Sequence, residues 1–265
     1  MSESIYNATV IGKILLTPDL MILRLKTDTP RDEFKAGQYT TIGLLAKEPR
    51  SYNSSIPLED IDPEILIKRP YSIASAKNET RDFEFYISQV KSGQLTPRLF
   101  NLSQGDRMWI DDKILGVFSL NDTPPNNNIV MIATGTGLAP YISFLRSHIA
   151  EHPEIKMAVI HGAAYPWDLG YYSELTFIQN VFKNFYYFPT LLKADNSWTG
   201  LRGYIEEHLS AGILENVGIE INPNKTHFFL CGNPRMVESV SKFLFEHRYT
   251  KHTSTCLGSL HIEEY

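Results

Sequence analysis

Hydrophobic and polar positions alternate in short runs from residue 5 to residue 110. The runs are rich in β-branched and aromatic residues and are separated by turn residues, which is typical of β-strands. The expected strands cover residues 8–15, 21–26, 39–44, 65–74, 83–90 and 107–110. Because no long helix intervenes, the pattern predicts a small antiparallel barrel or sandwich. A polar, proline-containing stretch at 45–64 is expected to be a long surface loop.

The pattern changes after a run of loop-forming residues at 121–128. Strands are expected at 129–133, 157–161, 185–192, 226–231 and 258–262, and helices at 139–150, 168–180 and 234–249. Such alternation predicts a parallel-sheet, Rossmann-like domain with ligands at the carboxyl ends of its strands. We therefore expect a two-domain β + α/β chain, with an antiparallel β-barrel over residues 1–123 and an α/β domain over residues 124–265.

Composition narrows the classes of function. The chain has 265 residues, 43% of them hydrophobic, which is enough for two buried cores. A formal net charge of −5 and the lack of a basic run argue against nucleic acid as a partner. No apolar run reaches membrane-spanning length and the first residues do not read as a targeting segment, so we expect a cytoplasmic protein without a membrane partner. Cys231 and Cys256 lack metal-ligand spacing, and no metal site is expected.

The stretch 69–75 combines a cation, an aromatic ring and hydroxyl groups. In an extended strand Arg69, Tyr71 and Ser75 point to one face, and Ser72 points to the other. Arg69 could bind a phosphate, Tyr71 could stack on an aromatic ring system, and Ser72 could hydrogen-bond to the heteroatoms of a ring. The stretch is therefore a candidate binding site for a flat, charged ligand. An edge strand with one exposed Arg and a half-buried Tyr explains the same residues without a ligand.

A second candidate binding segment begins at Gly93. Gly93 suits a turn, while Thr96 suits a helix cap and Pro97 the first helical turn, with Leu95 between them. The N-terminus of a helix offers unpaired N–H groups to an anion. A capped connecting helix without a ligand fits this segment equally well.

A glycine-rich segment follows the first expected strand of the second half. Thr134, Gly135, Thr136 and Gly137 come at the carboxyl end of that strand, and Pro140 lies in the helix that follows. Glycines let a backbone pass close to a pyrophosphate, and the dipole of the helix favours negative charge. The third glycine of the dinucleotide fingerprint is absent, so the signal comes from the position between strand and helix.

A fourth segment lies at another strand end. It joins the thiol of Cys231 to a glycine turn at Gly232, with Asn233 and Pro234 at the start of a helix. Most buried cysteines are inert, but a thiol at this edge of a nucleotide-binding sheet is a candidate functional group.

Five segments occur in the order and spacing of one enzyme family: 69–72 (Arg-Pro-Tyr-Ser), 93–96 (Gly-Gln-Leu-Thr), 135–140 (Gly-Thr-Gly-Leu-Ala-Pro), 231–234 (Cys-Gly-Asn-Pro) and 261–265 (His-Ile-Glu-Glu-Tyr). On these segments the chain resembles the ferredoxin (flavodoxin)–NADP⁺ reductases, in particular their bacterial branch. The resemblance implies an FAD-binding barrel followed by a domain that binds NADP(H). It also implies an enzyme that transfers hydride from NADPH to N5 of FAD and passes single electrons to ferredoxin or flavodoxin.

The resemblance gives roles to residues on the flavin side. Arg69 is the expected ligand of a flavin phosphate, Tyr71 the ring stacked on the isoalloxazine, and Ser72 the hydroxyl near N5. Gly93 and Thr96 are the expected ligands of the pyrophosphate. The full set of expected flavin-binding residues is Arg69, Tyr71, Ser72, Ser75, Gly93, Leu95 and Thr96.

On the coenzyme side, 135–140 is the expected pyrophosphate loop and Cys231 the side chain beside the nicotinamide. Tyr265 is expected on the flavin face opposite Tyr71, where it must move before hydride transfer. Ser72, Cys231 and Tyr265 are therefore the candidate catalytic residues. The remaining expected cofactor-binding residues are Thr134, Gly135, Thr136, Gly137, Pro140, Gly232, Asn233, Pro234 and Tyr265.

Two positions depart from the pattern of the family. Bacterial members hold the 2′-phosphate of NADP(H) with two arginines, where this chain has Ala164 and Leu191. We therefore expect a weakened preference for NADPH, with NAD(H) as a possible coenzyme. The cations that are candidates to replace the pair are Arg146, Lys193, Arg202 and Arg235. The loop at 45–64 is also longer than in short bacterial relatives.

Two other functions remain open on the sequence. The first, on the same fold, is the NAD(P)H-dependent reductase component of an oxygenase or a free-flavin reductase, although the cysteine pattern of a fused plant-type cluster domain is absent. The second is a regulatory subunit that binds flavin and nucleotide without turnover, in which Cys231 and Tyr265 have no chemical task. Within the family interpretation the chain is a monomer that passes electrons to ferredoxin or flavodoxin.

Overall fold

The computed structural model describes residues 5–55 and 61–263, and the chain divides into two compact units. The first unit is Met1–Val117 and the second is Phe118–Tyr265. Phe118 is buried, and its ring lies 6.1 Å from that of Tyr141 and 5.4 Å from that of Phe229, both in the second unit. The division falls at this aromatic cluster, a few residues before the 123/124 boundary that the polar loop predicts.

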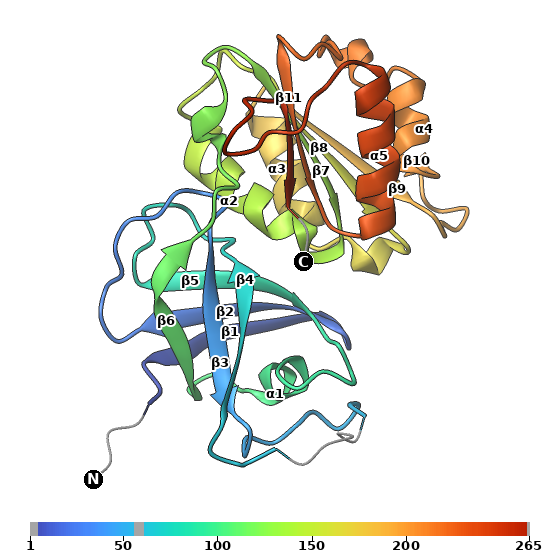
Figure 1. Cartoon of the computed structure of the whole chain (residues 1–265). Helices are drawn as coiled ribbons and strands as arrows, with labels where there is room; N and C mark the ends of the chain where they lie inside the picture. The colour runs from blue at the N-terminus through green and yellow to red at the C-terminus, as the bar shows by residue number, and fades with distance from the viewer. Residues whose placement is uncertain (1–4, 56–60, 264–265) are drawn as a thin grey trace. The chain divides into compact units, whose positions relative to one another are not determined.

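The first unit is an antiparallel barrel (Figure 1). Its strands are β1 (Ala8–Thr17), β2 (Leu20–Thr27), β3 (Tyr39–Leu45), β4 (Leu66–Ser72), β5 (Asp82–Ser88) and β6 (Arg107–Leu115), in the order β4-β3-β6-β1-β2-β5. An antiparallel bridge between Ile73 and Phe85, with a hydrogen bond of 2.8 Å from Ala74 N to Glu84 O, joins the two ends of this order. The barrel fold expected from the strand pattern is confirmed.

Alternating apolar residues fill the inside of the barrel. Leu25 on β2, Ile42 on β3 and Phe85 on β5 are completely buried, and each stabilises the unit by roughly 1.5–3 kcal/mol. Helix α1 (Thr96–Asn101) adds Leu99 to the same core. Lys13 donates 2.6 and 2.7 Å hydrogen bonds to the carbonyls of Phe100 and Leu102, at the end of the helix.

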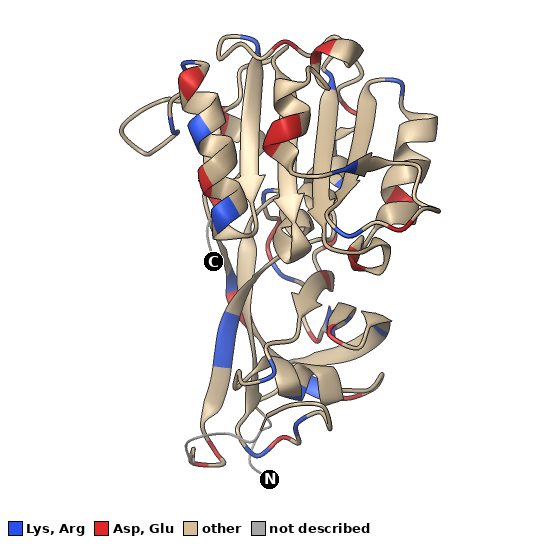
Figure 2. Cartoon of the chain, turned by 90° about the vertical axis from the view of Figure 1, so that its right-hand side faces the viewer, with Lys and Arg blue, Asp and Glu red and all other residues tan. Residues whose placement is uncertain are grey.

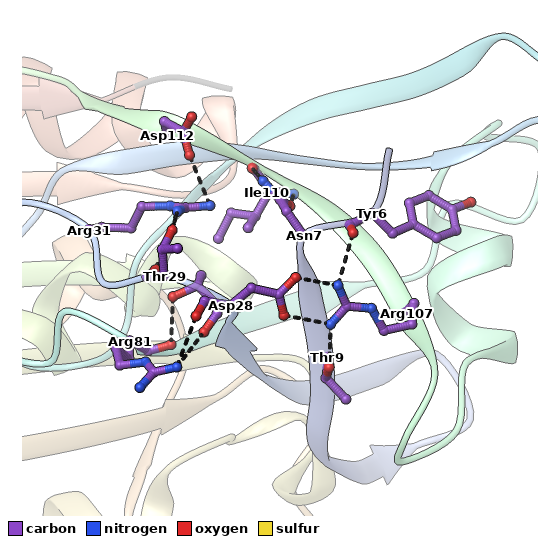
Figure 3. Close-up of polar contacts among 11 residues, drawn as sticks. Tyr6, Asn7, Thr9, Asp28, Thr29, Arg31, Arg81, Arg107, Ile110 and Asp112 are labelled. Carbon is purple, nitrogen blue, oxygen red and sulfur yellow. Dashed lines mark hydrogen bonds and ion pairs between the residues drawn. The ribbon is translucent and has the colours of Figure 1, made fainter. Parts of the chain in front are cut away.

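A charged network joins the ends of three barrel strands (Figure 3). Arg107 on β6 donates to both carboxylate oxygens of Asp28, which follows β2, and one of its nitrogens also donates to Thr9 Oγ1 of β1 at 2.6 Å. Arg81 Nη2 donates to the backbone carbonyl of Asp28 at 3.0 Å. The hydrogen bonds from Arg107 lower the pKa of Asp28. Because these groups are partly solvated, we attribute only about 0.5–1 kcal/mol to the ion pair.

The second unit is built on a parallel sheet. Its strands are β7 (Asn128–Thr134), β8 (Met157–Ala163), β9 (Phe185–Leu191), β10 (Leu201–Arg202), β11 (Thr226–Cys231) and β12 (Leu260–Glu263), in the order β10-β9-β8-β7-β11-β12. The strand order reverses between β7 and β11, which makes the carboxyl ends of these two strands the switch point where ligands bind in such sheets. The expected parallel sheet is confirmed.

Helices cover both faces of this sheet (Figure 1). They are α2 (Ala139–His148), α3 (Tyr172–Val181), α4 (Ile205–Ser210) and α5 (Pro234–Glu246), with short 3₁₀ turns η1 (Leu120–Asp122), η2 (Gly135–Leu138), η3 (Pro166–Asp168) and η4 (Glu215–Val217). Neighbouring residues on β11 face opposite sides, so Phe228 packs with the core under α4 and α5, whereas Phe229 packs against Phe144 of α2. The three central strands β7, β8 and β11 carry no Lys, Arg, Asp or Glu (Figure 2).

Several element bounds differ from the sequence-based expectation. The helix expected at 168–180 begins at Tyr172, because Pro166–Asp168 form a 3₁₀ turn and Tyr171 has a left-handed φ of 59°. The six-residue helix α4 and the two-residue strand β10 are too short to give a periodic signal and were not predicted. No helix within residues 5–55 and 61–263 is long and apolar enough to cross a membrane.

Candidate active site

Strand β4 ends with residues 69–72, the first candidate binding segment of the sequence. The Arg69 side chain is exposed, and it donates a 2.7 Å hydrogen bond to the carbonyl of Lys68. Tyr71 is half-buried, with its ring edge against Phe85 at 6.5 Å and 72°. Burial raises the pKa of Tyr71, so its phenol stays neutral. Ser72, also half-buried, is the last residue of the strand.

Ser75 departs from the expected alternation. β4 ends at Ser72, and Ile73 then pairs with β5, so the extended run does not continue to residue 75. Ser75 is completely buried, and its Oγ accepts a hydrogen bond of 3.4 Å from Glu84 N. Of the residues expected to form the ligand site on this strand, Arg69, Tyr71 and Ser72 therefore remain candidates.

The turn before α1 is held closed by Thr96. Its hydroxyl accepts a 2.9 Å hydrogen bond from Val90 N and donates one of 3.1 Å to Val90 O, while Gly93 N donates to the same carbonyl at 2.8 Å. The Cβ of any other residue at position 93 would lie 3.0 Å from that carbonyl oxygen, a tight contact that favours glycine there. The expectation that the Thr96 side chain caps the helix is wrong, because Leu95 is the N-cap residue and the hydroxyl is used in the turn.

The same turn presents unpaired backbone donors. Within the described ranges no group accepts a hydrogen bond from the N–H of Gln94, Leu95 or Thr96. The buried side chain of Leu95 anchors the turn to the barrel core. Unpaired N–H groups fit the oxygen atoms of a pyrophosphate, so the donor available at Thr96 is its backbone and not its hydroxyl.

In the second unit, the ends of β7 and β11 touch backbone to backbone. A Cβ built on Gly137 would lie 2.2 Å from the carbonyl oxygen of Cys231 and 2.8 Å from Gly232 N. A Cβ built on Gly232, which has a φ of 138°, would lie 2.5 Å from Thr134 Oγ1. Asn233 N donates to that hydroxyl at 2.8 Å. The two glycine segments found in the sequence therefore form one junction at the switch point.

Two helices begin at this junction. Gly135, with a φ of 56° and open space around it, starts the 3₁₀ turn η2, which continues through Thr136 and Gly137 into α2. Pro140 lies in the first turn of α2, and Pro234 in that of α5. Asn233 caps α5 by accepting a 2.9 Å hydrogen bond from Arg235 N. Both helix dipoles therefore begin at the edge where the strands end.

The thiol of Cys231 lies beside a carboxylate. Cys231 is completely buried, and its Sγ donates to Glu263 Oε2 at 3.8 Å. Glu263 was not among the candidate residues, although the parallel register of β11 and β12 pairs it with Cys231. Tyr265, the third candidate catalytic residue, lies outside the described residues.

The candidate 2′-phosphate ligands differ in their surroundings. Arg146 makes a bidentate ion pair with Glu174 at 2.7 and 2.8 Å, which ties α2 to α3. Arg202 donates to three backbone carbonyls between residues 194 and 198 at 2.6–2.9 Å. Leu191 is buried, so its position cannot offer a phosphate ligand. Lys193 and Arg235 are also exposed, and among the described residues neither side chain is bonded to a carbonyl or a carboxylate.

An aromatic stack lies at the carboxyl ends of β8 and β9. The rings of Tyr165 and Trp167 stack at 4.7 Å and 10°, and Lys193 Nζ lies 5.1 Å from the centre of the Tyr165 ring. The backbone N–H of Lys193 donates to the carbonyl of Ala164 at 2.8 Å. The sequence analysis gave Lys193 as a candidate phosphate ligand, but it did not predict that the rings of Tyr165 and Trp167 lie beside it.

Side chains that could hold a metal ion lie elsewhere in the second unit. His148, Glu151 and His152, at the end of α2, have ligand atoms within 4.8 Å of one another. The helix runs from the switch point toward the opposite edge of the sheet, so this group is separate from the candidate site.

Known sequences and structures resemble this chain along most of its length. Residues 131–242 match a family model described as an oxidoreductase NAD-binding domain. A flavodoxin/ferredoxin–NADP reductase of Buchnera aphidicola is 32% identical over 240 residues, which is 90% of either protein. A flavodoxin/ferredoxin–NADP reductase of Escherichia coli is 30% identical over 217 residues, or 82% of this chain and 81% of the relative. The crystal structure of a ferredoxin NADP⁺ reductase from Neisseria gonorrhoeae with bound FAD and NADP matches with a TM-score of 0.82 over 99% of both chains, at 23% identity.

Proposed function

This chain belongs to the flavodoxin/ferredoxin–NADP reductase family, and on that premise we propose that it transfers electrons between NADPH and ferredoxin or flavodoxin through a bound FAD. The observation that carries the proposal is the junction at the switch point of the second unit. There, Gly137 and Gly232 bring two strand ends into backbone contact, beside a thiol paired with a carboxylate. Such an edge suits a dinucleotide.

In the first unit, the proposed flavin site consists of residues 69–72 of β4 and the turn before α1. The Arg69 guanidinium binds a phosphate, the Tyr71 ring lies on the isoalloxazine, and the Ser72 hydroxyl approaches a ring nitrogen. The N–H groups of Gln94, Leu95 and Thr96 bind the pyrophosphate. When bound, the flavin supplies the conversion between hydride transfer and single-electron transfer.

In the second unit, the proposed coenzyme site is the junction with the starts of α2 and α5. Thr134, Gly135 and Thr136 pass close to the coenzyme pyrophosphate, which the dipole of α2 favours. Cys231 borders the nicotinamide, and Glu263 holds the thiol in place. The chain thus positions the coenzyme and excludes water, and needs no general acid or base of its own.

The proposed partner follows from the family rather than from a surface of this chain. Flavodoxin/ferredoxin–NADP reductases, such as the relatives from Buchnera and Escherichia coli, are named for one-electron carriers. We propose ferredoxin or flavodoxin as the carrier here. Monomeric state and cytoplasmic location stay predictions from the sequence.

Flavin retention tests the function through Arg69. The purified chain should contain FAD, and Arg69→Ala should raise the dissociation constant of FAD about 10- to 100-fold, because charge-assisted contacts contribute about 1.5–3 kcal/mol. Flavin fluorescence on dilution of the holoprotein measures this constant. Lys68→Ala removes the neighbouring cation, whose Nζ lies 5.5 Å from the Trp109 ring, and should leave FAD bound. Release of FMN alone, or equal effects of the two variants, would contradict the proposed flavin site.

Coenzyme choice should depend on Lys193 and Arg235. We expect the chain to use NADPH with only a moderate preference over NADH, and each of Lys193→Ala and Arg235→Ala to reduce that preference by about tenfold, since one charge-assisted contact is lost. Arg146→Ala is the control, because this arginine is paired with Glu174. Steady-state kcat/KM with both coenzymes and an artificial acceptor gives the ratio. A preference that falls only in Arg146→Ala would place the 2′-phosphate at α2.

A further inference from the structure

Residues 46–55, which follow β3 and are here called the 46–55 segment, are hydrogen-bonded to the turn that carries the proposed pyrophosphate donors. Its Arg50 donates from Nη1 to the carbonyl of Gly93 at 2.9 Å and from Nη2 to the carbonyls of Lys91 at 3.2 Å and Ser55 at 3.0 Å. One guanidinium thus holds carbonyls of the turn and of the 46–55 segment together.

Further hydrogen bonds fasten the 46–55 segment on either side of Arg50. Ser51 N donates to Pro97 O at 2.9 Å, and Gln89 Nε2 donates to Ser51 Oγ at 2.5 Å, with both side chains buried. Arg98 of α1, which is also buried, donates to the carbonyls of Ala46 at 2.6 Å and Gln94 at 2.6 Å. The turn therefore cannot change shape without breaking several of these bonds.

Peptide geometry links these carbonyls to the unpaired donors. In a planar trans peptide the C=O and the N–H of the next residue point in opposite directions. Because the carbonyls of Lys91 and Gly93 face Arg50, and that of Gln94 faces Arg98, the N–H groups of Ser92, Gln94 and Leu95 point away from the arginines. None of these three N–H groups has a hydrogen-bond acceptor in the part of the chain that the structure describes.

Two arginines lie on the carbonyl side of the turn, and Lys91 of the turn pairs with Asp19 at 3.1 Å. Burial lowers the pKa of Arg50 and, with the nearby positive charge of Arg50, that of Arg98. Glu48 is the acidic group that acts on Arg98, and its own Oε1 accepts a hydrogen bond of 2.7 Å from Tyr6. Two guanidinium groups bound to carbonyls polarise the peptides so that their N–H groups are stronger donors.

We propose that the 46–55 segment positions the turn that binds the flavin pyrophosphate, and that Arg50 is its positioning residue. This inference rests on the proposed function. Arg50 acts by holding the carbonyls of Lys91 and Gly93 in place. The N–H groups of the same two peptides, which belong to Ser92 and Gln94, then point toward the phosphate oxygens. The chain thereby gains selectivity for a flavin with a pyrophosphate over one without.

The test compares the affinities of FAD and riboflavin, because riboflavin lacks the phosphates. Riboflavin is titrated into the FAD-loaded full chain, and displaced FAD gives the ratio of the two dissociation constants. Arg50→Ala should reduce the preference for FAD by about tenfold. Lys47→Ala, which removes an exposed cation of the same segment paired with Glu64, should leave the ratio unchanged. Should Arg50→Ala not fold, Arg50→Gln takes its place with the same expectation.

Other outcomes overturn the inference. A purely structural role for Arg50 would weaken both flavins alike and leave the ratio at its wild-type value. Arg50→Lys keeps the charge but not the planar fork that reaches three carbonyls, so recovery of the wild-type ratio by lysine would contradict positioning. A wild-type chain that holds no FAD would instead refute the proposed function, and the two failures are thereby distinguished.

Discussion

Replacing Gly137 with alanine should lower the free energy of unfolding of the second unit by about 3 kcal/mol or more. The new Cβ would lie 2.2 Å from the carbonyl oxygen and 2.5 Å from the carbonyl carbon of Cys231. Both are backbone atoms of a central strand, so neither can rotate out of the way. The loop must instead lift off the end of β11, and we expect NADPH binding to weaken by at least about tenfold as well. Denaturant unfolding and coenzyme titration measure the two effects.

Gly135→Ala is the matched control for this prediction. Gly135 lies two residues earlier in the same turn, and a Cβ there has nothing within 4 Å. Its left-handed φ of 56° still makes a side chain unfavourable, by about 1–2 kcal/mol. The control should therefore cost less stability than Gly137→Ala. Equal losses would show that backbone conformation, and not the contact with Cys231, explains the glycine at 137.

Acidification should destabilise the second unit through three buried histidines. Burial lowers the pKa of His161 to about 4, and burial together with neighbouring histidines lowers that of His227 to about 4 and of His261 to about 3. In the unfolded chain each titrates near its ordinary value of about 6.5. The unfolded state therefore binds more protons as the pH falls from about 6.5 to about 4, and stability decreases through that window while it is unaffected above it. For His161 alone the loss by pH 4 is about 3 kcal/mol.

The surroundings of these histidines explain why their pKa values are lowered. His161 on β8 has one ring nitrogen 3.2 Å from the hydroxyl of Tyr187, and its buried Nε2 has no partner among the described residues. His227 and His261 share a hydrogen bond of 2.9 Å, and the His261 ring stacks on Phe229 at 4.2 Å. Among the described residues, no carboxylate bonds to any of these three rings, so an added proton would be buried without a partner of opposite charge. The ring of His252, whose Nε2 lies 3.7 Å from Asp122 Oδ2, stacks on the ring of His261 at 4.6 Å.

Urea unfolding measured between about pH 7 and about pH 4.5 checks this prediction. His161→Gln removes one proton from the difference in proton binding between the unfolded and the folded state, and so should reduce the slope of unfolding free energy against pH. The substitution also lowers stability at neutral pH. His152→Gln changes an exposed histidine and serves as the control. A stability that does not change across this window would contradict the buried, neutral state of the three rings.

The sequence alone determined the class of both units. Alternation with a period of two marks the barrel strands, and strand–helix alternation marks the parallel sheet, because each pattern reflects which face of a local element is buried. The five short segments were also found from the sequence, since glycine, proline and strand ends are local features. Short elements such as α4 gave no signal, because six residues do not complete two helical turns.

The tertiary structure decided which residues meet. Gly137 and Cys231 touch because β11 lies next to β7, and Glu263 reaches the thiol because β12 pairs with β11 in register. No local pattern contains the order of strands in a sheet. From the sequence, Arg146 is a candidate phosphate ligand. Only the packing of α2 against α3 shows that Glu174 pairs with it. Residue type and spacing thus indicate what chemistry a chain can carry, while contacts between distant segments determine which groups remain available for it.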